Sequence, residues 1–302
     1  MKMQVRGERM AQGQIRKALS GYYYVFQDGE LIQCRGRGVF RNRGESPLVG
    51  DIVDYTKEGE SDGYIMKIHP RKNELIRPPI ANIDQALLVF SVKEPDFNTI
   101  LLDRFLVVLE SFQVKPIICL TKMDLLTEAT QQQLQNYVTQ YKEIGYEIIE
   151  TYKDDQTLLD RLKPILEGKT SVLAGQSGVG KSTLLNTLLP NLNLQTGVIS
   201  QSLGRGKHTT RHVELIEVCG GLLADTPGFS SFDFDTIEKE ELTSCFPEFA
   251  RISEDCKFRG CLHMKEPKCA VKSALETGEI QSYRYEHYQQ FLQEILDRKP
   301  RY

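Results

Sequence analysis

The sequence predicts an α/β protein in three parts: a small β-barrel, a mostly parallel sheet with helices, and a helical tail that binds a metal. Three patterns support this fold class. Short alternating runs fill residues 12–70, continuous apolar runs alternate with amphipathic helices from Ile83 onward, and three cysteines with a histidine gather near the C-terminus. We expect domains over residues 1–72, 73–233 and 234–302.

The first part is predicted to consist of several short strands. Tyr22, Tyr24 and Phe26 fall at every second position, and extended runs such as “LIQCRGRGVF” and “GYIMKIH” follow, separated by glycine-rich breaks. Strands this short and this closely spaced predict a barrel of the oligonucleotide-binding (OB) type, and hence an RNA-binding domain. A generic SH3-like barrel fits the pattern almost as well.

The second part has the sequence pattern of a parallel sheet with helices between its strands. “DQALLVFSV” and “PIICLTK” are continuous apolar runs, as expected for strands covered on both faces. An apolar stripe at helical spacing separates them, and further helices are expected over Glu128–Ile144 and around Leu158–Leu166. The remaining expected strands are “YEIIET”, “TSVLAG”, “HVELIEV” and “GLLAD”. Strands that alternate with helices in this way predict a parallel α/β sheet.

“GQSGVGKST”, residues 175–183, matches the Walker A pattern, with a predicted strand before it and a helix after it. Glycines let successive backbone N–H groups surround phosphates, and the N-terminus of the following helix adds its positive dipole. Lys181 would neutralise β- and γ-phosphate charge, and the Ser182 hydroxyl would bind Mg²⁺. The predicted phosphate ligands are Gly175, Gln176, Ser177, Gly178, Val179, Gly180, Lys181, Ser182 and Thr183.

“TKMD”, Thr121 to Asp124, follows a predicted strand and selects the base. The Asp124 carboxylate can accept hydrogen bonds from guanine N1–H and N2–H₂, which adenine does not offer, and Lys122 can lay its alkyl stem on the purine. Thr121, Lys122, Met123 and Asp124 are therefore expected to bind GTP or GDP, with modest affinity because Thr121 replaces the usual Asn. A P-loop kinase or ATPase is the alternative, against which Asp124 argues.

The base-reading stretch precedes the phosphate loop, which reverses the usual order in a GTPase. Each stretch follows a strand, and the C-terminal ends of parallel strands meet at one edge of a sheet. Ligand binding therefore depends on where these residues lie in space and not on their order along the chain. Joining the original termini and opening new ones elsewhere leaves such a site intact. We therefore expect a circularly permuted GTPase core.

“DTPG”, Asp225 to Gly228, follows the last predicted strand of the core. Asp225 can hold Mg²⁺, directly or through water, and Gly228 lets its backbone N–H approach the γ-phosphate without a Cβ in the way. Phe229 stands where many GTPases place a water-orienting glutamine, which predicts slow intrinsic hydrolysis and a need for an activator.

The basic stretch “GRGKHTTRH”, residues 204–212, suits a loop that wraps the γ-phosphate. Thr210 is the predicted second Mg²⁺ ligand, with Thr209 as the alternative. His208 is a candidate catalytic group, although simple attraction to phosphate or RNA explains it equally well. The predicted catalytic residues are thus Lys181, Asp225, Gly228 and His208.

Cys256, Cys261, His263 and Cys269 form a compact Cys₃His set. Four such ligands suit a closed tetrahedral Zn²⁺ site without an open position, so the zinc is expected to be structural. The alternative is three unrelated thiols and a histidine. The residues between the ligands are basic and are expected to face RNA.

The net charge of −3 hides an uneven distribution. Residues 1–50 hold nine Lys/Arg against four Asp/Glu, and residues 251–272 hold six against three, which suggests polyanion contact at both ends; a random asymmetry is the alternative. The longest apolar runs, such as “ALLVF”, are too short to span a bilayer, and no signal pattern opens the chain. We expect a cytoplasmic protein without a membrane partner.

In this order, the stretches “LIRPPIANIDQ”, “LLDRFLV”, “TKMDL”, “GQSGVGKSTLLN”, “GRGKHTTRHVEL”, “DTPGFS” and “CKFRGCLHMKEPKCAVK” resemble the ribosome small subunit-dependent GTPase A family. These are bacterial circularly permuted GTPases, and the resemblance covers residues 13–302. It implies an N-terminal OB barrel, a permuted GTPase core and a C-terminal zinc domain. Thr151 departs from the family's usual Ser-Ala type in the loop that closes over the base.

The resemblance also implies a role late in maturation of the 30S ribosomal subunit, with GTP hydrolysis stimulated by that subunit. By motif, residues 121–124 and 175–183 bind GTP, and the Cys₃His set binds zinc. We further expect GTP-gated binding to 16S rRNA by a monomer. The rival interpretation is an rRNA-binding module whose nucleotide only sets its shape.

Overall fold

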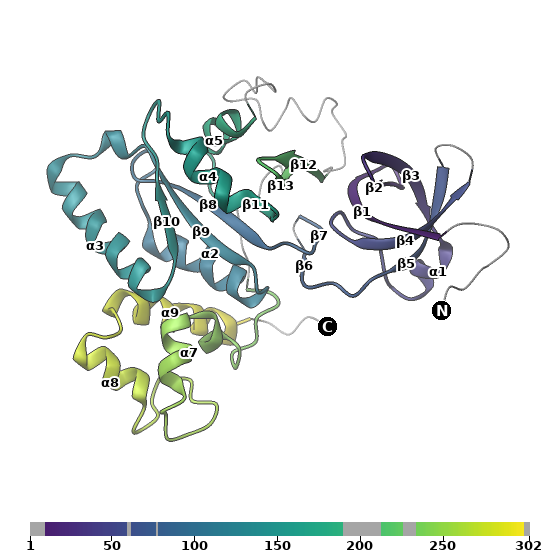
Figure 1. Cartoon of the computed structure of the whole chain (residues 1–302). Helices are drawn as coiled ribbons and strands as arrows, with labels where there is room; N and C mark the ends of the chain where they lie inside the picture. Colours follow the sequence, from purple (N-terminus) through teal and green to yellow (C-terminus); the bar gives the residue numbers. More distant parts are fainter. Residues whose placement is uncertain (1–9, 59–61, 77, 190–212, 226–233, 299–302) are drawn as a thin grey trace. The chain divides into compact units, whose positions relative to one another are not determined.

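The computed structural model describes residues 10–58, 62–76, 78–189, 213–225 and 234–298 (Figure 1). Contacts between Cα atoms divide the chain into two compact units. Unit 1 comprises Met1–Gln85, Gln156–Ala174 and Lys181–Phe229, and unit 2 comprises Ala86–Asp155, Gly175–Gly180 and Ser230–Tyr302. Each unit therefore combines segments that lie far apart in the sequence.

Unit 1 begins with a five-stranded barrel. Its strands are β1 (Met10–Leu19), β2 (Tyr22–Gln27), β3 (Glu30–Gly36), β4 (Ile52–Glu58) and β5 (Asp62–Ile68), with the short helix α1 (Gly38–Asn42) between β3 and β4. Strand β1 pairs with both β2 and β4, which closes the barrel, and β3 runs parallel to β5. Ile15, Val25 and Val53 are fully buried. This barrel confirms the predicted OB type.

A second sheet region belongs to the same unit. Strand β11 (Thr170–Ala174) runs parallel to β13 (Gly221–Asp225), which pairs antiparallel with β12 (Glu214–Val218). Strand β1 of the barrel also pairs with β12, where the Lys17 amine lies 2.8 Å from the Glu214 carboxylate. The remaining described elements of unit 1 are β6 (Glu74–Leu75), β7 (Ile80–Ala81), α4 (Leu158–Leu166) and α5 (Lys181–Leu188).

The hairpin of β12 and β13 departs from a purely parallel arrangement. Only Cys219 and Gly220 separate the two strands, with φ angles of 50° and 74°. A two-residue link cannot carry the crossover that parallel strands need, and two successive positive φ angles are typical of a type I′ hairpin turn. The sheet is therefore mostly, and not wholly, parallel, as predicted.

The strands of unit 2 follow the order β10 (Glu147–Glu150), β9 (Lys115–Thr121) and β8 (Gln85–Ser91), and β10 is parallel to β9. Every residue of β8 is buried, in keeping with its continuous apolar run. Helix α2 (Thr99–Ser111) begins after Asn98, whose side chain accepts a hydrogen bond from the Leu101 N–H at 3.0 Å. Four residues of its predicted apolar stripe are buried, namely Leu102, Phe105, Leu106 and Leu109, whereas the fifth, Phe112, is only half-buried at the C-cap.

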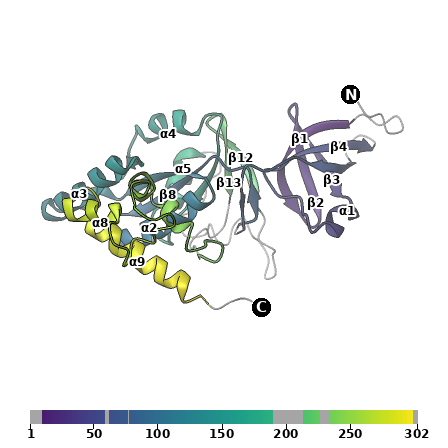
Figure 2. The same cartoon turned by 90° about the horizontal axis from the view of Figure 1, so that it is seen from below.

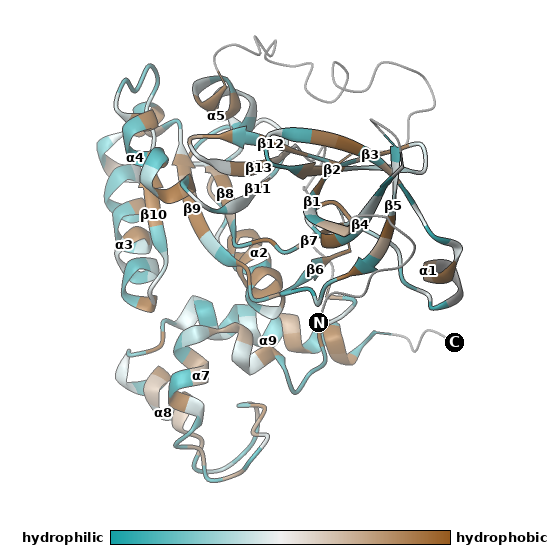
Figure 3. Cartoon of the chain, turned by 45° about the vertical axis from the view of Figure 1, so that its right-hand side comes forward, coloured by the Kyte–Doolittle hydropathy of each residue, from teal (hydrophilic) through white to brown (hydrophobic). Residues whose placement is uncertain are grey.

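Helix α3 (Glu128–Ile144) has the predicted bounds. It buries only Leu134, Val138 and Tyr141, and Figure 3 accordingly shows it as largely hydrophilic. One narrow apolar stripe is what a helix on the surface of a sheet needs.

The C-terminal part of unit 2 is helical, as predicted. It contains the 3₁₀ helix η3 (Leu242–Cys245) and the helices α7 (Pro247–Ser253), α8 (Ala270–Thr277) and α9 (Ser282–Leu296). Helix α9 lies beside α2 (Figure 2). Aromatic rings fill the space between these helices, with the Phe249 and Tyr288 centroids 4.9 Å apart. None of the described helices is long and apolar enough to cross a membrane.

Candidate nucleotide site and metal centre

The loop with the Walker A pattern follows β11 and leads directly into α5. Gly175 has a φ of 142°, and a Cβ there would lie 2.2 Å from the carbonyl oxygen of Val89. Gly180 has a φ of 97°, and its Cβ would lie 3.5 Å from the Thr121 hydroxyl oxygen. Backbone geometry therefore requires glycine at both ends of the loop, as a phosphate cradle does.

The base-reading stretch meets this loop through Thr121. Its hydroxyl donates to the carbonyl oxygen of Val179 at 2.5 Å, and it lies 3.4 Å from the carbonyl oxygen of Phe90. Because Thr121 is only 6% exposed, this bond is shielded from water. Two motifs whose bonded residues are 58 positions apart are thereby joined within unit 2.

Asp124 lies on the 3₁₀ helix η1 (Met123–Leu125), and its exposed carboxylate accepts a hydrogen bond from the Lys153 backbone N–H at 2.8 Å. The Met123 N–H donates to the Thr151 carbonyl oxygen at 3.2 Å, and the Thr151 N–H donates to Leu120 at 2.7 Å. The segment after β10 therefore fixes the position of the carboxylate that is predicted to read guanine.

Lys122 precedes η1 in a left-handed conformation, with a φ of 60°. Its amine donates to the backbone carbonyl oxygen of Glu94. Since the charged end has a backbone partner, the alkyl stem is the part left to contact a purine face.

Lys181 and Ser182 open α5, and both are half-buried. Burial lowers the pKa of the Lys181 amine, because the charged form loses hydration. A phosphate beside the amine would favour the charged form again, and the N-terminus of α5 would add its dipole. These residues therefore fit a nucleotide phosphate with its Mg²⁺.

Asp225 ends β13, and the backbone register sets Ala224 opposite Val172 of β11. Asp225 therefore stands near the end of β11. The other predicted residues of this part of the site lie outside the described residues: His208, Thr209, Thr210, Gly228 and Phe229.

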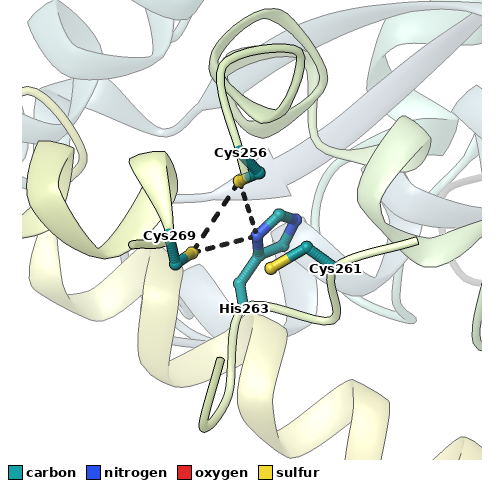
Figure 4. A group of neighbouring side chains, drawn as sticks. All are labelled: Cys256, Cys261, His263 and Cys269. Carbon is teal, nitrogen blue, oxygen red and sulfur yellow. Dashed lines mark hydrogen bonds between the residues drawn. The ribbon is translucent and has the colours of Figure 1, made fainter. Parts of the chain in front are cut away.

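Cys256, Cys261, His263 and Cys269 converge on one point (Figure 4), with their ligand atoms within 4.8 Å of one another. The Cys256 and Cys269 sulfurs are 3.9 Å apart. His263 Nδ1 lies 3.3 Å from the Cys269 sulfur and 3.7 Å from that of Cys256. Two sulfurs bound to one tetrahedral zinc at about 2.3 Å lie about 3.8 Å apart, so these spacings fit zinc.

The chemistry of the cluster also fits a metal. Burial raises the pKa of the Cys261 thiol to about 12, and a bound cation would offset this by stabilising the thiolate. Burial lowers the pKa of His263, which keeps the ring in the neutral form that binds metal. Helix α9 supports the cluster, since the Tyr285 hydroxyl donates to the His263 carbonyl oxygen at 2.6 Å.

A buried set of charges, here called the Arg284 cluster, joins α9 to α2 and α7. The Arg284 side chain is 1% exposed and lies 2.5 Å from the Asp103 carboxylate and 2.7 Å from that of Glu248. Asp103 is fully buried and also accepts a hydrogen bond from the Tyr141 hydroxyl at 2.6 Å. His287 Nδ1 lies 2.6 Å from its second oxygen. These bonds link the C-terminal helices to the part of the core that carries the base-reading stretch.

Two of these features could not be recognised in the sequence. Lys153 acts through its backbone N–H, which leaves no trace in a side-chain pattern. Arg284 belongs to the tail that was predicted only as helical, and an arginine is generally expected to face water. The one signal was Asp103, a charged residue inside the apolar stripe of α2.

Comparison with known proteins agrees with this architecture. The RsgA GTPase family model matches residues 68–235, and the RsgA N-terminal domain model matches residues 12–65. The small ribosomal subunit biogenesis GTPase RsgA of Geobacillus sp. (strain WCH70) is 59% identical to this chain over 293 residues, and that of Bacillus anthracis is 58% identical. Each alignment covers 97% of this chain and 100% of the relative.

Solved structures show the same similarity. The crystal structure of YloQ, described as a circularly permuted GTPase, is 52% identical and has a TM-score of 0.84, with all of both chains covered. YjeQ from Thermotoga maritima is 37% identical with a TM-score of 0.84, covering 96% of this chain and all of its own. The permuted motif order, the barrel and the Cys₃His cluster agree with these matches, and the chain belongs to the RsgA family of circularly permuted GTPases.

Proposed function

We propose that this chain hydrolyses GTP as a checkpoint or assembly factor in late maturation of the small (30S) ribosomal subunit. Its membership of the RsgA GTPase family supports the reaction, and the names of its relatives, small ribosomal subunit biogenesis GTPases, support the setting. One observation carries the proposal. The hydrogen bond from Thr121 to Val179 joins the base-reading stretch to the phosphate loop, although the two are permuted in the chain.

In this proposal Asp124 accepts the guanine N–H groups, and the Lys153 backbone N–H holds the carboxylate in position. Lys181 neutralises phosphate charge, while Ser182 and Thr210 bind Mg²⁺, which supplies further positive charge to the phosphates. Asp225 supports the metal, and the Gly228 N–H approaches the γ-phosphate.

Hydrolysis is expected to be slow in the isolated protein, because Phe229 cannot orient a water molecule. The small subunit would accelerate hydrolysis by contacting and ordering the loop around His208. Binding of the protein to the subunit would in turn depend on bound GTP.

The flanking parts would hold 16S rRNA. The OB barrel carries basic residues, and so does the loop between the metal ligands, which a structural zinc would keep folded. We expect the protein to act as a monomer in the cytoplasm.

Turnover of GTP by the wild type, with and without purified 30S subunits, tests the function. Subunits should accelerate turnover strongly, and Lys181→Ala should lower the stimulated rate by several orders of magnitude, since it removes charge from the phosphates. If subunits accelerate the wild type but Lys181→Ala hydrolyses GTP at the same stimulated rate, the assigned phosphate site is wrong.

Two rival functions have distinct outcomes in the same assay. An RNA-binding module that uses nucleotide only to set its shape would bind subunits in a GTP-dependent manner without stimulated turnover. If the protein were an ATPase or kinase, excess ATP would inhibit its turnover of GTP. If Asp124 reads guanine, ATP should compete poorly with GTP and leave that turnover nearly unchanged.

A further inference from the structure

The segment between the first two metal ligands exposes an aromatic ring. Phe258 is 43% exposed, although phenylalanine is among the residues most often buried. It lies in the short connection from Cys256 to Cys261, far in the sequence from the nucleotide motifs. The ring takes no part in the described aromatic core of the C-terminal helices.

One cation contacts this ring, and the stretch around it in the sequence is basic. The Lys257 amine lies 5.3 Å from the centroid of the Phe258 ring, within the range of a cation–π contact. The one acid in the stretch 256–269 is Glu266, whose carboxylate accepts hydrogen bonds from the backbone N–H groups of Leu262 at 2.9 Å and Met264 at 2.8 Å. The exposed cations of the stretch are Lys257, Arg259, Lys265 and Lys268.

The connection is also held in shape. Cys256 and Cys261 fix its two ends at the metal cluster, and the Lys257 N–H donates to the Lys268 carbonyl oxygen at 3.4 Å. Gly260 turns the chain back with a φ of 70°. A ring presented on a fixed loop loses little conformational freedom when a ligand covers it, which favours binding.

We infer that Phe258 stacks on an unpaired base of RNA, with Lys257 and Arg259 contacting the phosphates that flank it. A phenyl face among cations is the usual composition of a site for single-stranded nucleic acid, because every base offers a π-face and every nucleotide a charge. Paired bases in a duplex present no free face. This inference deepens the proposed function, on which it rests for the natural source of the RNA.

A protein partner fits these observations less well. A stable protein interface buries on the order of 800 Å² on each side and is depleted in lysine at its centre. One phenyl ring in a stretch with four exposed cations lacks the apolar area for such a centre.

The chain contains no tryptophan, which makes a direct test possible. Phe258→Trp introduces a single tryptophan at the ring position, which can be excited selectively over the tyrosines, and stacking of a base should quench its emission. Leu159→Trp is the matched control, since Leu159 is 37% exposed on α4, next to the acidic Asp160. Oligouridylate and purified 30S subunits should quench the first variant and not the second, while duplex RNA should quench neither.

Affinity and its salt dependence separate stacking from charge. Phe258→Leu keeps an apolar side chain but no π-face, and should weaken oligouridylate binding about fivefold or more without changing the slope of log K against log salt. Arg259→Gln should reduce that slope by about 0.7, the value for one phosphate contact to a single strand. The zinc content of each variant should equal that of the wild type.

An unquenched Phe258→Trp, or a Phe258→Leu variant that binds oligouridylate like the wild type, would overturn the inference. Enhanced and blue-shifted emission with subunits would identify a protein contact and overturn it as well. The proposed function is judged separately by wild-type GTP turnover: quenching without subunit-stimulated turnover would reject that function and leave the stacking site.

Discussion

Arg284→Met should destabilise unit 2 by about 3–5 kcal/mol, the usual cost of removing one partner from a buried ion pair. The side chains of Asp103 and Arg284 are 0% and 1% exposed, and that of Glu248 is 8% exposed. Methionine fills much of the space of arginine, so the loss would come mainly from two buried carboxylates without their cation. Since a domain has only about 5–15 kcal/mol of folding free energy, the change should be large.

Urea denaturation of the zinc-loaded protein, followed by far-ultraviolet circular dichroism and by zinc release, would measure this loss. Lys115→Met is the matched control, because the Lys115 amine pairs with Glu147 at the surface and such pairs contribute about 0–1 kcal/mol. Replacing all three charges, with Asp103→Asn and Glu248→Gln added to Arg284→Met, should recover part of the stability. Equal losses in Arg284→Met and Lys115→Met would refute the reasoning.

Three further predictions concern the loop, the motif contact and the barrel. Gly175→Ala should abolish binding of a fluorescent GDP analogue, because its Cβ would lie 2.2 Å from the Val89 carbonyl oxygen; wild-type affinity would contradict this geometry. Thr121→Val should weaken the same binding about five- to tenfold by leaving a buried carbonyl unpaired, whereas Thr121→Ser should retain it. Burial raises the pKa of Cys34 from 9.0 to about 11, so its neutral thiol favours the folded barrel below pH 9, and this contribution should be lost as the pH rises toward about 11. In Cys34→Ala, the free energy of unfolding should not show this loss between pH 9 and about 11. If its dependence on pH equals that of the wild type, the thiol does not contribute.

Elements whose place is decided by burial alone could be predicted from the sequence. The bounds of α3 and α4 agree with those expected from apolar spacing, and β8 is buried along its whole length as its apolar run required. The Cys₃His set was also predictable, because its members lie close in sequence and a metal needs all of them at one point.

Features that depend on pairing could not be predicted in the same way. The choice between an OB and an SH3-like barrel required the pairing of β1 with both β2 and β4. The partners of Arg284 lie on α2 and α7, and spacing along α9 carries no information about them. The contact of Thr121 with Val179 depends on how two loops meet, since neither motif specifies the other.

Subunit-stimulated hydrolysis of two nucleotides by wild type and Asp124→Asn would test the proposed function most directly. The amide can donate to the extra oxygen of xanthine where the carboxylate accepts from guanine. Purified 30S subunits should therefore accelerate GTP hydrolysis by the wild type and xanthosine triphosphate hydrolysis by Asp124→Asn, each with little effect on the other nucleotide. GTP hydrolysis by Asp124→Asn at the wild-type stimulated rate, or no acceleration of the wild type by subunits, would contradict a guanine-specific GTPase that acts on the small subunit.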